Sequence, residues 1–342
     1  MALKDYIVQE VALDCEEGLL SRREALRRLA LMGISGAAAA TLLAACGDDD
    51  AGSSATGPND TGTADTGLAD TGPPTTGPPD TGLAPPTTAA STTPPTTDAA
   101  APGTESTEPP AASTPPTGEE IRFSGPNGEL IGVVAEASSP RGAVLVIHEN
   151  RGLTPHIRSI PPRLAADGYT ALAIDLLSEE GGTASLPSEG DATAALGNAP
   201  SERMIADLQA GLDELGRRAP EAKLATIGFC FGGGMTWQLL AAGEPRLAAA
   251  VPFYGPFPAG ASLAGSPNAA VLGIYAGLDD RVNGTMEAAE AALTDAGLTH
   301  ELRVFDGVDH AFFNDTGPRY DPAAAAEAYQ AMLDWFAQHL AT

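Results

Sequence analysis

A glycine-rich turn between an apolar run and a helix-forming run is the feature that most constrains how this chain can fold. The turn and its flanks read Ala225-Thr226-Ile227-Gly228-Phe229-Cys230-Phe231-Gly232-Gly233-Gly234, and residues 235–242 continue as a predicted helix. A strand, a tight turn and a helix in this order form the elbow that holds a nucleophile above a sheet. Gly228 and Gly232 lack a Cβ, so strand and helix can approach closely on either side of the turn.

The residue at the tip of this turn indicates its chemistry. Elbows of this kind usually carry serine, whereas this one carries Cys230. The dipole of the following helix and a neighbouring imidazolium would both favour the thiolate form of a cysteine there. Two other interpretations are a small buried residue in the turn and a phosphate-binding loop. The second is disfavoured because neither a Gly-Lys-Ser/Thr ending nor a G-x-G-x-x-G spacing is present.

Two candidate partners follow Cys230 in the order nucleophile, acid, base. Asp279 comes directly after a predicted strand at 270–275, and His310 comes after a predicted strand at 300–305. His310 would take the thiol proton of Cys230, and Asp279 would orient the imidazole ring. Taken singly, Asp279 is also a plausible turn residue and His310 a plausible loop histidine. The three residues together, each at the end of a strand, indicate a catalytic triad.

The chain resembles the dienelactone hydrolase family, the cysteine-dependent members of the α/β-hydrolase superfamily. The resemblance covers residues 120–342 and includes the elbow and the segments around Asp279 and His310. Two further motifs carry it, namely Ile147-His148-Glu149-Asn150-Arg151-Gly152-Leu153 and Ala173-Ile174-Asp175-Leu176. It implies an α/β-hydrolase fold, with a mostly parallel central sheet and helices on both faces. It also implies hydrolysis of ester or lactone bonds through a Cys-His-Asp triad and a thioester acyl-enzyme, with water as second substrate and no cofactor.

The same resemblance implies roles for residues around the triad. Glu149 corresponds to a glutamate that holds the resting thiol until substrate arrives, although a solvated loop carboxylate is the alternative. The backbone N–H groups of Phe231 and Asn150 would form the oxyanion hole. Founding members bind the substrate carboxylate with an arginine a few residues beyond the catalytic histidine. Here Asn314 stands four residues after His310. Arg151 and Arg158 are candidates to supply the positive charge instead, and capping of the following helix is the alternative for Arg151. A carboxylic ester hydrolase of open specificity is therefore expected.

The first 45 residues resemble a twin-arginine export signal joined to a lipoprotein cleavage site. Ser21-Arg22-Arg23-Glu24-Ala25-Leu26 precedes a weakly apolar run over 29–45, which ends in Leu42-Leu43-Ala44-Ala45-Cys46-Gly47. The run is too short to span a membrane. The pattern predicts removal of residues 1–45, lipidation of Cys46, and an exported protein attached to the cell envelope only by its lipid. The alternative is an N-terminal amphipathic or disordered segment that is retained.

Residues 46–118 read as a disordered tether, and residues 119–342 as the catalytic domain. The tether consists mainly of Asp, Thr, Gly, Pro, Ala and Ser, with repeated Asp-Thr-Gly triplets at 60–62, 65–67, 70–72 and 80–82. Such a composition buries too little apolar surface to offset the entropy of ordering. The triplets resemble those of aspartic proteases but lack flanking apolar strands, so that interpretation is disfavoured.

The catalytic part alternates strand and helix patterns. Predicted strands cover 121–124, 130–135, 143–148, 170–174, 224–229, 247–253, 270–275 and 300–305. Predicted helices cover 155–167, 200–218, 233–243, 285–296 and 322–340. Pro161 and Pro162 are expected to kink or shorten the first helix. The segment at 177–199 is expected to be either a wall of the substrate pocket or a passive surface loop.

Charge and cysteine usage exclude other classes of function. The net charge is −27, which argues against binding of nucleic acid or of anionic lipid surfaces. The five histidines show no metal-binding spacing, so no metal site is predicted. A thiol redox role is disfavoured because Cys15 and Cys46 would be removed or blocked, leaving no partner for Cys230. A small-molecule ester or lactone and a monomeric state are expected, and a non-catalytic ligand-binding lipoprotein remains the alternative.

Overall fold

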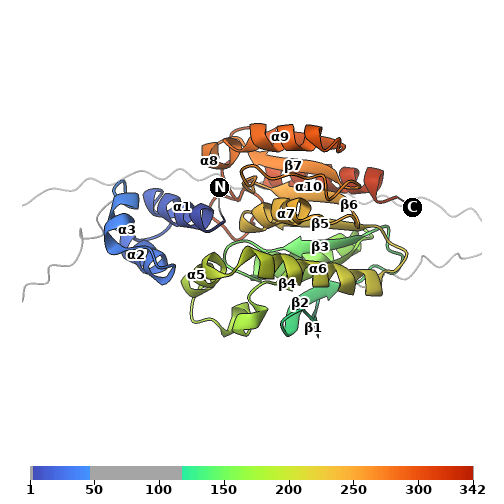
Figure 1. The fold of residues 1–342 in the computed structure, drawn as a ribbon, viewed down its shortest axis with the longest axis horizontal. Coiled ribbons are helices and arrows are strands. Elements are labelled where there is room, and N and C mark those ends of the chain that lie inside the picture. Colours follow the sequence, from blue (N-terminus) through green and yellow to red (C-terminus); the bar gives the residue numbers. More distant parts are fainter. Residues whose placement is uncertain (1–2, 47–117, 342) are drawn as a thin grey trace, which may run out of the picture. The chain divides into compact units, whose positions relative to one another are not determined.

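An eight-stranded sheet forms the centre of the fold, with strand order β1-β2-β4-β3-β5-β6-β7-β8 (Figure 1). The strands are β1 (Glu119–Ser124), β2 (Glu129–Ala135), β3 (Ala143–Ile147), β4 (Thr170–Asp175), β5 (Leu224–Phe229), β6 (Leu247–Phe253), β7 (Ala270–Ala276) and β8 (His300–Phe305). Strand β2 pairs antiparallel with β1 and β4, and all pairs from β4 to β8 are parallel. All eight predicted strands are confirmed, with ends within two residues of the predicted positions.

The computed structural model describes residues 3–46 and 118–341, which belong to one compact unit. Residues 47–117, and with them nearly all of the predicted tether and its Asp-Thr-Gly triplets, lie outside the described residues. Every residue of β3, β4, β5 and β7 is buried, as expected for parallel strands covered on both faces. The continuous apolar runs of the sequence therefore mark the centre of the sheet.

The five predicted helices are present as α4 (Pro155–Ala166), α6 (Ser201–Arg218), α7 (Phe231–Ala242), α9 (Met286–Asp295) and α10 (Pro322–His339). Helix α4 connects β3 to β4, toward the β1 edge of the sheet, whereas α6 and α7 lie in connections that run toward the β8 edge. Because such crossovers are right-handed, α4 lies on the face of the sheet opposite to α6 and α7. Figure 1 shows α6 and α7 in front of the sheet. Because β3 to β8 are parallel, their carboxyl ends lie at the same edge of the sheet, and the loops that follow them contribute to a shared site.

Two local expectations for this region are revised by the structure. Helix α4 contains both Pro161 and Pro162 and still runs to Ala166, so the prolines do not shorten it, while the kink stays a prediction. The segment at 177–199 is not a plain loop: it holds two 3₁₀ turns, η1 (Ser178–Glu180) and η2 (Thr183–Ser185), and helix α5 (Glu189–Asn198). Helix α5 contacts the N-terminal helices α1 and α2, which local sequence patterns did not indicate. A further short helix, α8 (Asp280–Asn283), follows β7.

Residues 3–46 fold into three helices, α1 (Leu3–Glu16), α2 (Arg22–Leu31) and α3 (Gly36–Leu42). The side chains of Ser21 and Ser35 cap α2 and α3 by accepting hydrogen bonds from backbone N–H groups three residues later. Helix α1 contacts α5 and α7, so its apolar face is part of the core. No helix among residues 3–46 and 118–341 is long and apolar enough to cross a membrane. Removal of this segment as an export signal stays a prediction.

Candidate active site

Cys230 lies at the tip of the turn between β5 and α7, in a backbone conformation that side chains rarely adopt. Its φ is 56° and its ψ is −116°, and its N–H donates to the carbonyl of Phe253 at 3.1 Å. A non-glycine residue in this region is strained, and such strain is typical of residues held for function. The turn predicted from the glycine pattern is thus present, with the thiol directed to the carboxyl edge of the sheet.

The glycines on either side of the turn have no room for a side chain. A Cβ added to Gly228 would lie 2.0 Å from the carbonyl oxygen of Gly232, and one added to Gly232 would lie 2.3 Å from that of Ile147. We therefore expect Gly228→Ala to lower the free energy of unfolding by about 3 kcal/mol or more, measured by urea titration. Gly216→Ala in α6 is the matched control, because a Cβ there meets no atom within 4 Å. The control should be neutral or stabilising by about 0.5–1 kcal/mol, and equal losses in both variants would contradict the argument.

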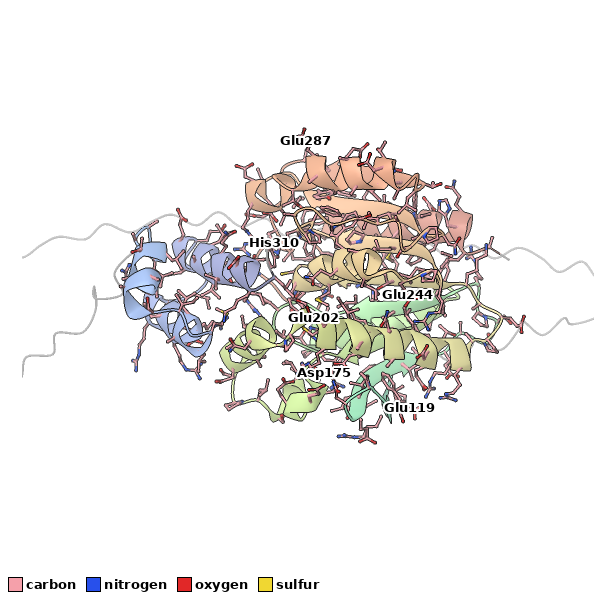
Figure 2. All side chains as sticks on the ribbon, in the orientation of Figure 1. Glu119, Asp175, Glu202, Glu244, Glu287 and His310 are labelled. Atoms are coloured by element: carbon pink, nitrogen blue, oxygen red, sulfur yellow. The ribbon has the colours of Figure 1, made fainter. Side chains whose placement is uncertain are left out.

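Asp279 and His310 are brought together although 30 residues separate them in the sequence. Nδ1 of His310 and Oδ2 of Asp279 are 2.5 Å apart, and both side chains are buried. The other carboxylate oxygen of Asp279 accepts from the N–H of Val282 at 3.1 Å, which fixes its orientation at the start of α8. Figure 2 shows His310 where the end of the sheet approaches α1. The pair has the arrangement in which a carboxylate orients a basic imidazole.

A tyrosine hydroxyl lies between the base and the thiol. Oη of Tyr6 is 3.2 Å from Sγ of Cys230 and 3.2 Å from Nε2 of His310. Within the described residues no direct hydrogen bond joins His310 to Cys230. Tyr6 belongs to α1, in the part of the chain that the sequence marked as an export signal, so its presence at this site was not predicted.

The charges around His310 favour its protonated form. Burial by itself lowers the pKa of His310, but the negative charges of Glu10, Asp279 and Cys230 outweigh it and raise this pKa well above its ordinary value. Oε1 of Glu10 lies 3.6 Å from Nε2 of His310. Burial also raises the pKa of Asp279, but the charge and hydrogen bond of His310 hold it below its ordinary value. These directions favour an imidazolium next to a carboxylate.

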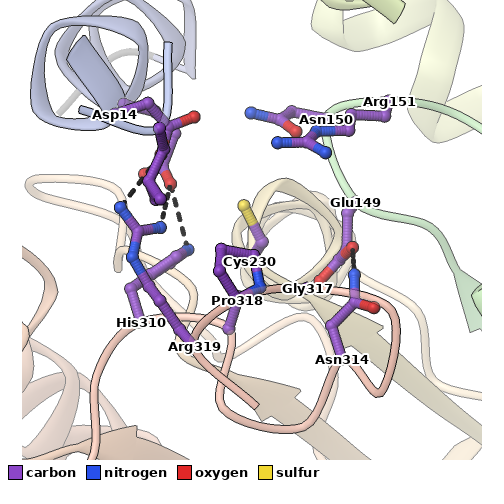
Figure 3. A pocket seen from close by; sticks show the side chains of 13 residues that line it. Asp14, Glu149, Asn150, Arg151, Cys230, His310, Asn314, Gly317, Pro318 and Arg319 are labelled. Atoms are coloured by element: carbon purple, nitrogen blue, oxygen red, sulfur yellow. Dashed lines mark hydrogen bonds and ion pairs between the residues drawn. The ribbon is translucent and has the colours of Figure 1, made fainter. Parts of the chain in front are cut away.

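Glu149 follows β3 and is buried at the same edge of the sheet. One of its oxygens accepts from Nδ2 of Asn314 at 2.6 Å, as the dashed line in Figure 3 shows. The other has no hydrogen-bond partner within the described residues. Burial raises the pKa of Glu149, and nearby His156 and Arg151 only partly offset this effect. Asn314, which the sequence offered as a substrate-binding residue, is thus positioned to orient Glu149.

Phe231 and Asn150 are the residues whose backbone N–H groups were expected beside the thiol. Phe231 is the first residue of α7, where helical N–H groups have no partner within the helix, and Asn150 lies in the loop after β3. No acceptor for either N–H is present among residues 3–46 and 118–341. Asn150 and Cys230 line the same cavity (Figure 3). The oxyanion hole expected from these two N–H groups stays a prediction.

A cavity of about 180 Å³ opens beside Cys230. One wall comes from the hydrolase fold and the other from the N-terminal segment, whose Glu10, Asp14 and Leu19 line it together with Arg319. Arg151 also lines the cavity, is partly exposed, and forms an ion pair with Glu189 at 3.3 Å. Arg158 is not among the lining residues and instead pairs with Glu120 at 2.9 Å.

Sequence analysis missed Tyr6, Glu10, Asp14, Arg281 and Arg319. The sequence contained a helical pattern that could have indicated them, because the residues of α1 that are buried recur at helical spacing: Leu3, Tyr6, Ile7, Glu10, Val11 and Asp14.

Ligand atoms of Glu10, Cys230 and His310 lie within 4.8 Å of one another, a spacing that suits a metal ion. However, the Glu10 carboxylate already pairs with the guanidinium groups of Arg281 and Arg319, which disfavours a cation there.

Residues 130–340 match the profile of the dienelactone hydrolase family over more than half of the chain. The chain belongs to this family. A protein of Escherichia coli O157:H7 named "Putative carboxymethylenebutenolidase" is 36% identical over 219 residues, which cover 60% of this chain and 79% of that protein.

Solved structures agree with this membership. A "Putative Dienelactone Hydrolase" from Klebsiella pneumoniae superposes with a TM-score of 0.58 at 31% identity, covering 65% of this chain and 99% of that chain. A dienelactone hydrolase-like promiscuous phosphotriesterase from metagenomic libraries gives a TM-score of 0.53 at 28% identity, covering 66% and 100%. The protein is thus a dienelactone hydrolase-like member of the α/β-hydrolases, and residues 3–46 lie outside the matched region.

Proposed function

We propose that this family member hydrolyses carboxylic esters or lactones through Cys230, His310 and Asp279. The observation that carries the proposal is that a strained cysteine and the histidine of a buried His310–Asp279 pair line one cavity. A binding module has no need of these groups in this order and geometry. Enzymes of several classes use this constellation for acyl transfer.

In the proposed reaction, the Cys230 thiolate attacks the carbonyl carbon, and the oxyanion receives hydrogen bonds from the N–H groups of Phe231 and Asn150. Collapse of this intermediate breaks the ester C–O bond, and the protonated His310 gives its proton to the leaving alkoxide. The neutral imidazole then takes a proton from water, whose oxygen attacks the thioester. The carboxylic acid leaves and the thiolate is restored. Asp279 keeps the imidazole oriented and stabilises its charge in both steps.

Glu149 is proposed to hold the thiol proton in the resting state. A carboxyl whose pKa is raised by burial can accept a proton from a neighbouring acid and keep it out of water. The hydrogen bond from Asn314 fixes one oxygen and leaves the other available. Asn314 carries no charge and donates its hydrogen bond to Glu149, so it does not offer a cation to a substrate carboxylate. We therefore propose that neutral esters and lactones are better substrates than anionic ones.

The test is a panel of aryl esters and lactones, graded in size and charge, given to the purified full-length protein. Hydrolysis of neutral members, together with a mass gain on the peptide containing Cys230 when a slow ester is used, is the expected result. Absence of turnover with every member, and of any acyl adduct, both in the full-length protein and after removal of residues 1–45, would contradict the proposal. A clear preference for the anionic analogue that disappears in Arg151→Ala would instead assign carboxylate binding to Arg151.

We also propose that the chain is exported and lipidated, on the strength of Arg22-Arg23 and of Ala44-Ala45-Cys46. The mature protein is then expected to begin at Cys46, to carry a lipid there, and to sediment with membranes. Cys46→Ser should leave the precursor unprocessed. Intact-mass measurement checks this, and a native protein that retains residues 1–45 without lipid would overturn it.

A further inference from the structure

Tyr6 occupies space that the proposed reaction needs. For His310 to protonate the leaving group, the oxygen of that group must come within about 2.6–3.2 Å of Nε2 while its carbon is bonded to Sγ. The Tyr6 hydroxyl oxygen lies 3.2 Å from both atoms, so it stands where the leaving oxygen would be. Cys230 and His310 are only 3% and 1% exposed with α1 in place. An ester cannot adopt the reacting geometry until Tyr6 moves.

Ion pairs hold α1 over the site. Arg319, in the loop before α10, pairs with Asp14 at 3.0 Å and with Glu17 at 2.5 Å. Arg281, in α8, pairs with Glu10, and its guanidinium lies 4.3 Å from the centre of the Tyr6 ring. The side chains of Arg281 and Arg319 are 16% and 12% exposed, so salt screens these pairs less than it screens surface pairs. Arg281 follows Asp279 after β7, and Arg319 lies on the same segment after β8 as His310.

Apolar contacts complete the docking. Leu3 and Ile7 are buried on the face of α1 that packs on the hydrolase fold and α5. The Leu3 side chain lies beside Gly234 of α7, and that of Ile7 beside Gly197 of α5. Charge pairing and apolar packing thus act on one helix, and together they place a single hydroxyl between the base and the nucleophile.

We propose that α1 is an intramolecular inhibitor that closes the active site of the full-length chain, and that turnover requires its displacement. The proposal rests on the proposed hydrolase function. The proposal also links the cleavage proposed before Cys46 to activity, because removal of residues 1–45 would take α1 away from Cys230 and open the active site. The enzyme would then be held closed as a precursor and opened when it is cut.

The competing possibility is that α1 is a permanent wall of the substrate site. A cavity remains beside Cys230 with α1 in place, and Tyr6 would then position the substrate or pass a proton. The two alternatives predict opposite effects on turnover when α1 is loosened. Accessibility of the Cys230 thiol supplies a second measurement that does not depend on the identity of the ester.

The experiment compares the full-length protein with a Leu3→Ala/Ile7→Ala double variant and with a Glu10→Gln variant. The double variant loosens α1 without altering a charge near the thiol, and Glu16→Gln on the exposed side of α1 is the control for Glu10→Gln. A fifth protein carries a protease site inserted between Cys46 and Gly118 and is measured before and after cutting. The readouts are the rate of Cys230 alkylation by iodoacetamide, followed by peptide mass spectrometry, and the turnover of a neutral aryl ester.

Loosening or cutting should raise both rates by about tenfold or more, because most molecules are in the closed state while α1 is docked. Glu16→Gln should leave both unchanged. Faster alkylation together with slower turnover would show that α1 is a permanent wall of the substrate site. Unchanged alkylation in all proteins would show that α1 does not close the active site. Either result overturns the proposal. Faster alkylation without turnover of any ester would support closure and contradict the hydrolase function.

Discussion

Cys230→Ala is expected to lower kcat for a neutral aryl ester by about 10⁴-fold or more while the protein remains folded. The thiolate forms the covalent bond in the proposed mechanism, and alanine offers no nucleophile in its place. The N–H groups of Phe231 and Asn150 would remain, so a small residual rate over water is expected. Alanine replaces one small buried side chain by another, and the melting temperature should change little. Initial rates and thermal unfolding of the same preparations provide the measurement.

Neither of the other two cysteines offers a matched control, because Cys15 lies in α1 and Cys46 is the proposed lipidation site. Cys230→Ser should fall between alanine and the native residue, because a hydroxyl is a weaker nucleophile in a site that positions a thiol. A Cys230→Ala protein that keeps most of the native rate would contradict the mechanism. If Cys230→Ala loses activity because it unfolds, that variant does not test the nucleophile. The rate of the folded Cys230→Ser protein is then the test.

Asp279→Asn is expected to lower kcat/KM by about 10²- to 10⁴-fold. Asparagine can still accept the hydrogen bond from Val282 at the start of α8, so the local backbone should hold. What is lost is the negative charge beside Nδ1 of His310. Because that charge raises the pKa of His310, its removal should lower this pKa and move the corresponding limb of the pH–rate profile to lower pH.

Asp280→Asn is the matched control, since the adjacent carboxylate is exposed and the change in charge is the same. It should leave both kcat/KM and the pH–rate profile nearly unchanged. Equal losses in the two variants would indicate a general electrostatic effect of the acidic surface. A full rate in Asp279→Asn would remove Asp279 from the proposed triad.

Much of the hydrolase fold follows from local patterns. The apolar runs of β3 and β5 could be assigned because strands buried on both faces need continuous apolar sequence. The elbow could be assigned because close contact between β5 and α7 excludes a Cβ at Gly228 and Gly232. The positions of Asp279 and His310 also followed from the sequence, because the carboxyl ends of parallel strands meet at one edge of the sheet.

Other features depend on contacts that no local pattern contains. Asn314 was considered for its place after His310, yet its partner is Glu149, 165 residues away. Arg158 was a candidate for the site but pairs with Glu120 on β1. Hydrogen bonds of this kind are decided by how loops from different strands fold over one another, and spacing along the chain does not encode that.

The N-terminal helices show this division most clearly. The sequence by itself indicated that Arg22-Arg23 and Cys46 resemble an export signal, and no helix was predicted over residues 3–16. Only the tertiary structure brought Tyr6 to His310 across 304 residues and set the carboxylates of α1 against Arg281 and Arg319. The spacing of apolar residues in a helix indicates which of its faces is buried, because that spacing is a local property of the sequence. The surface that covers it depends on shape and charge assembled from the whole chain.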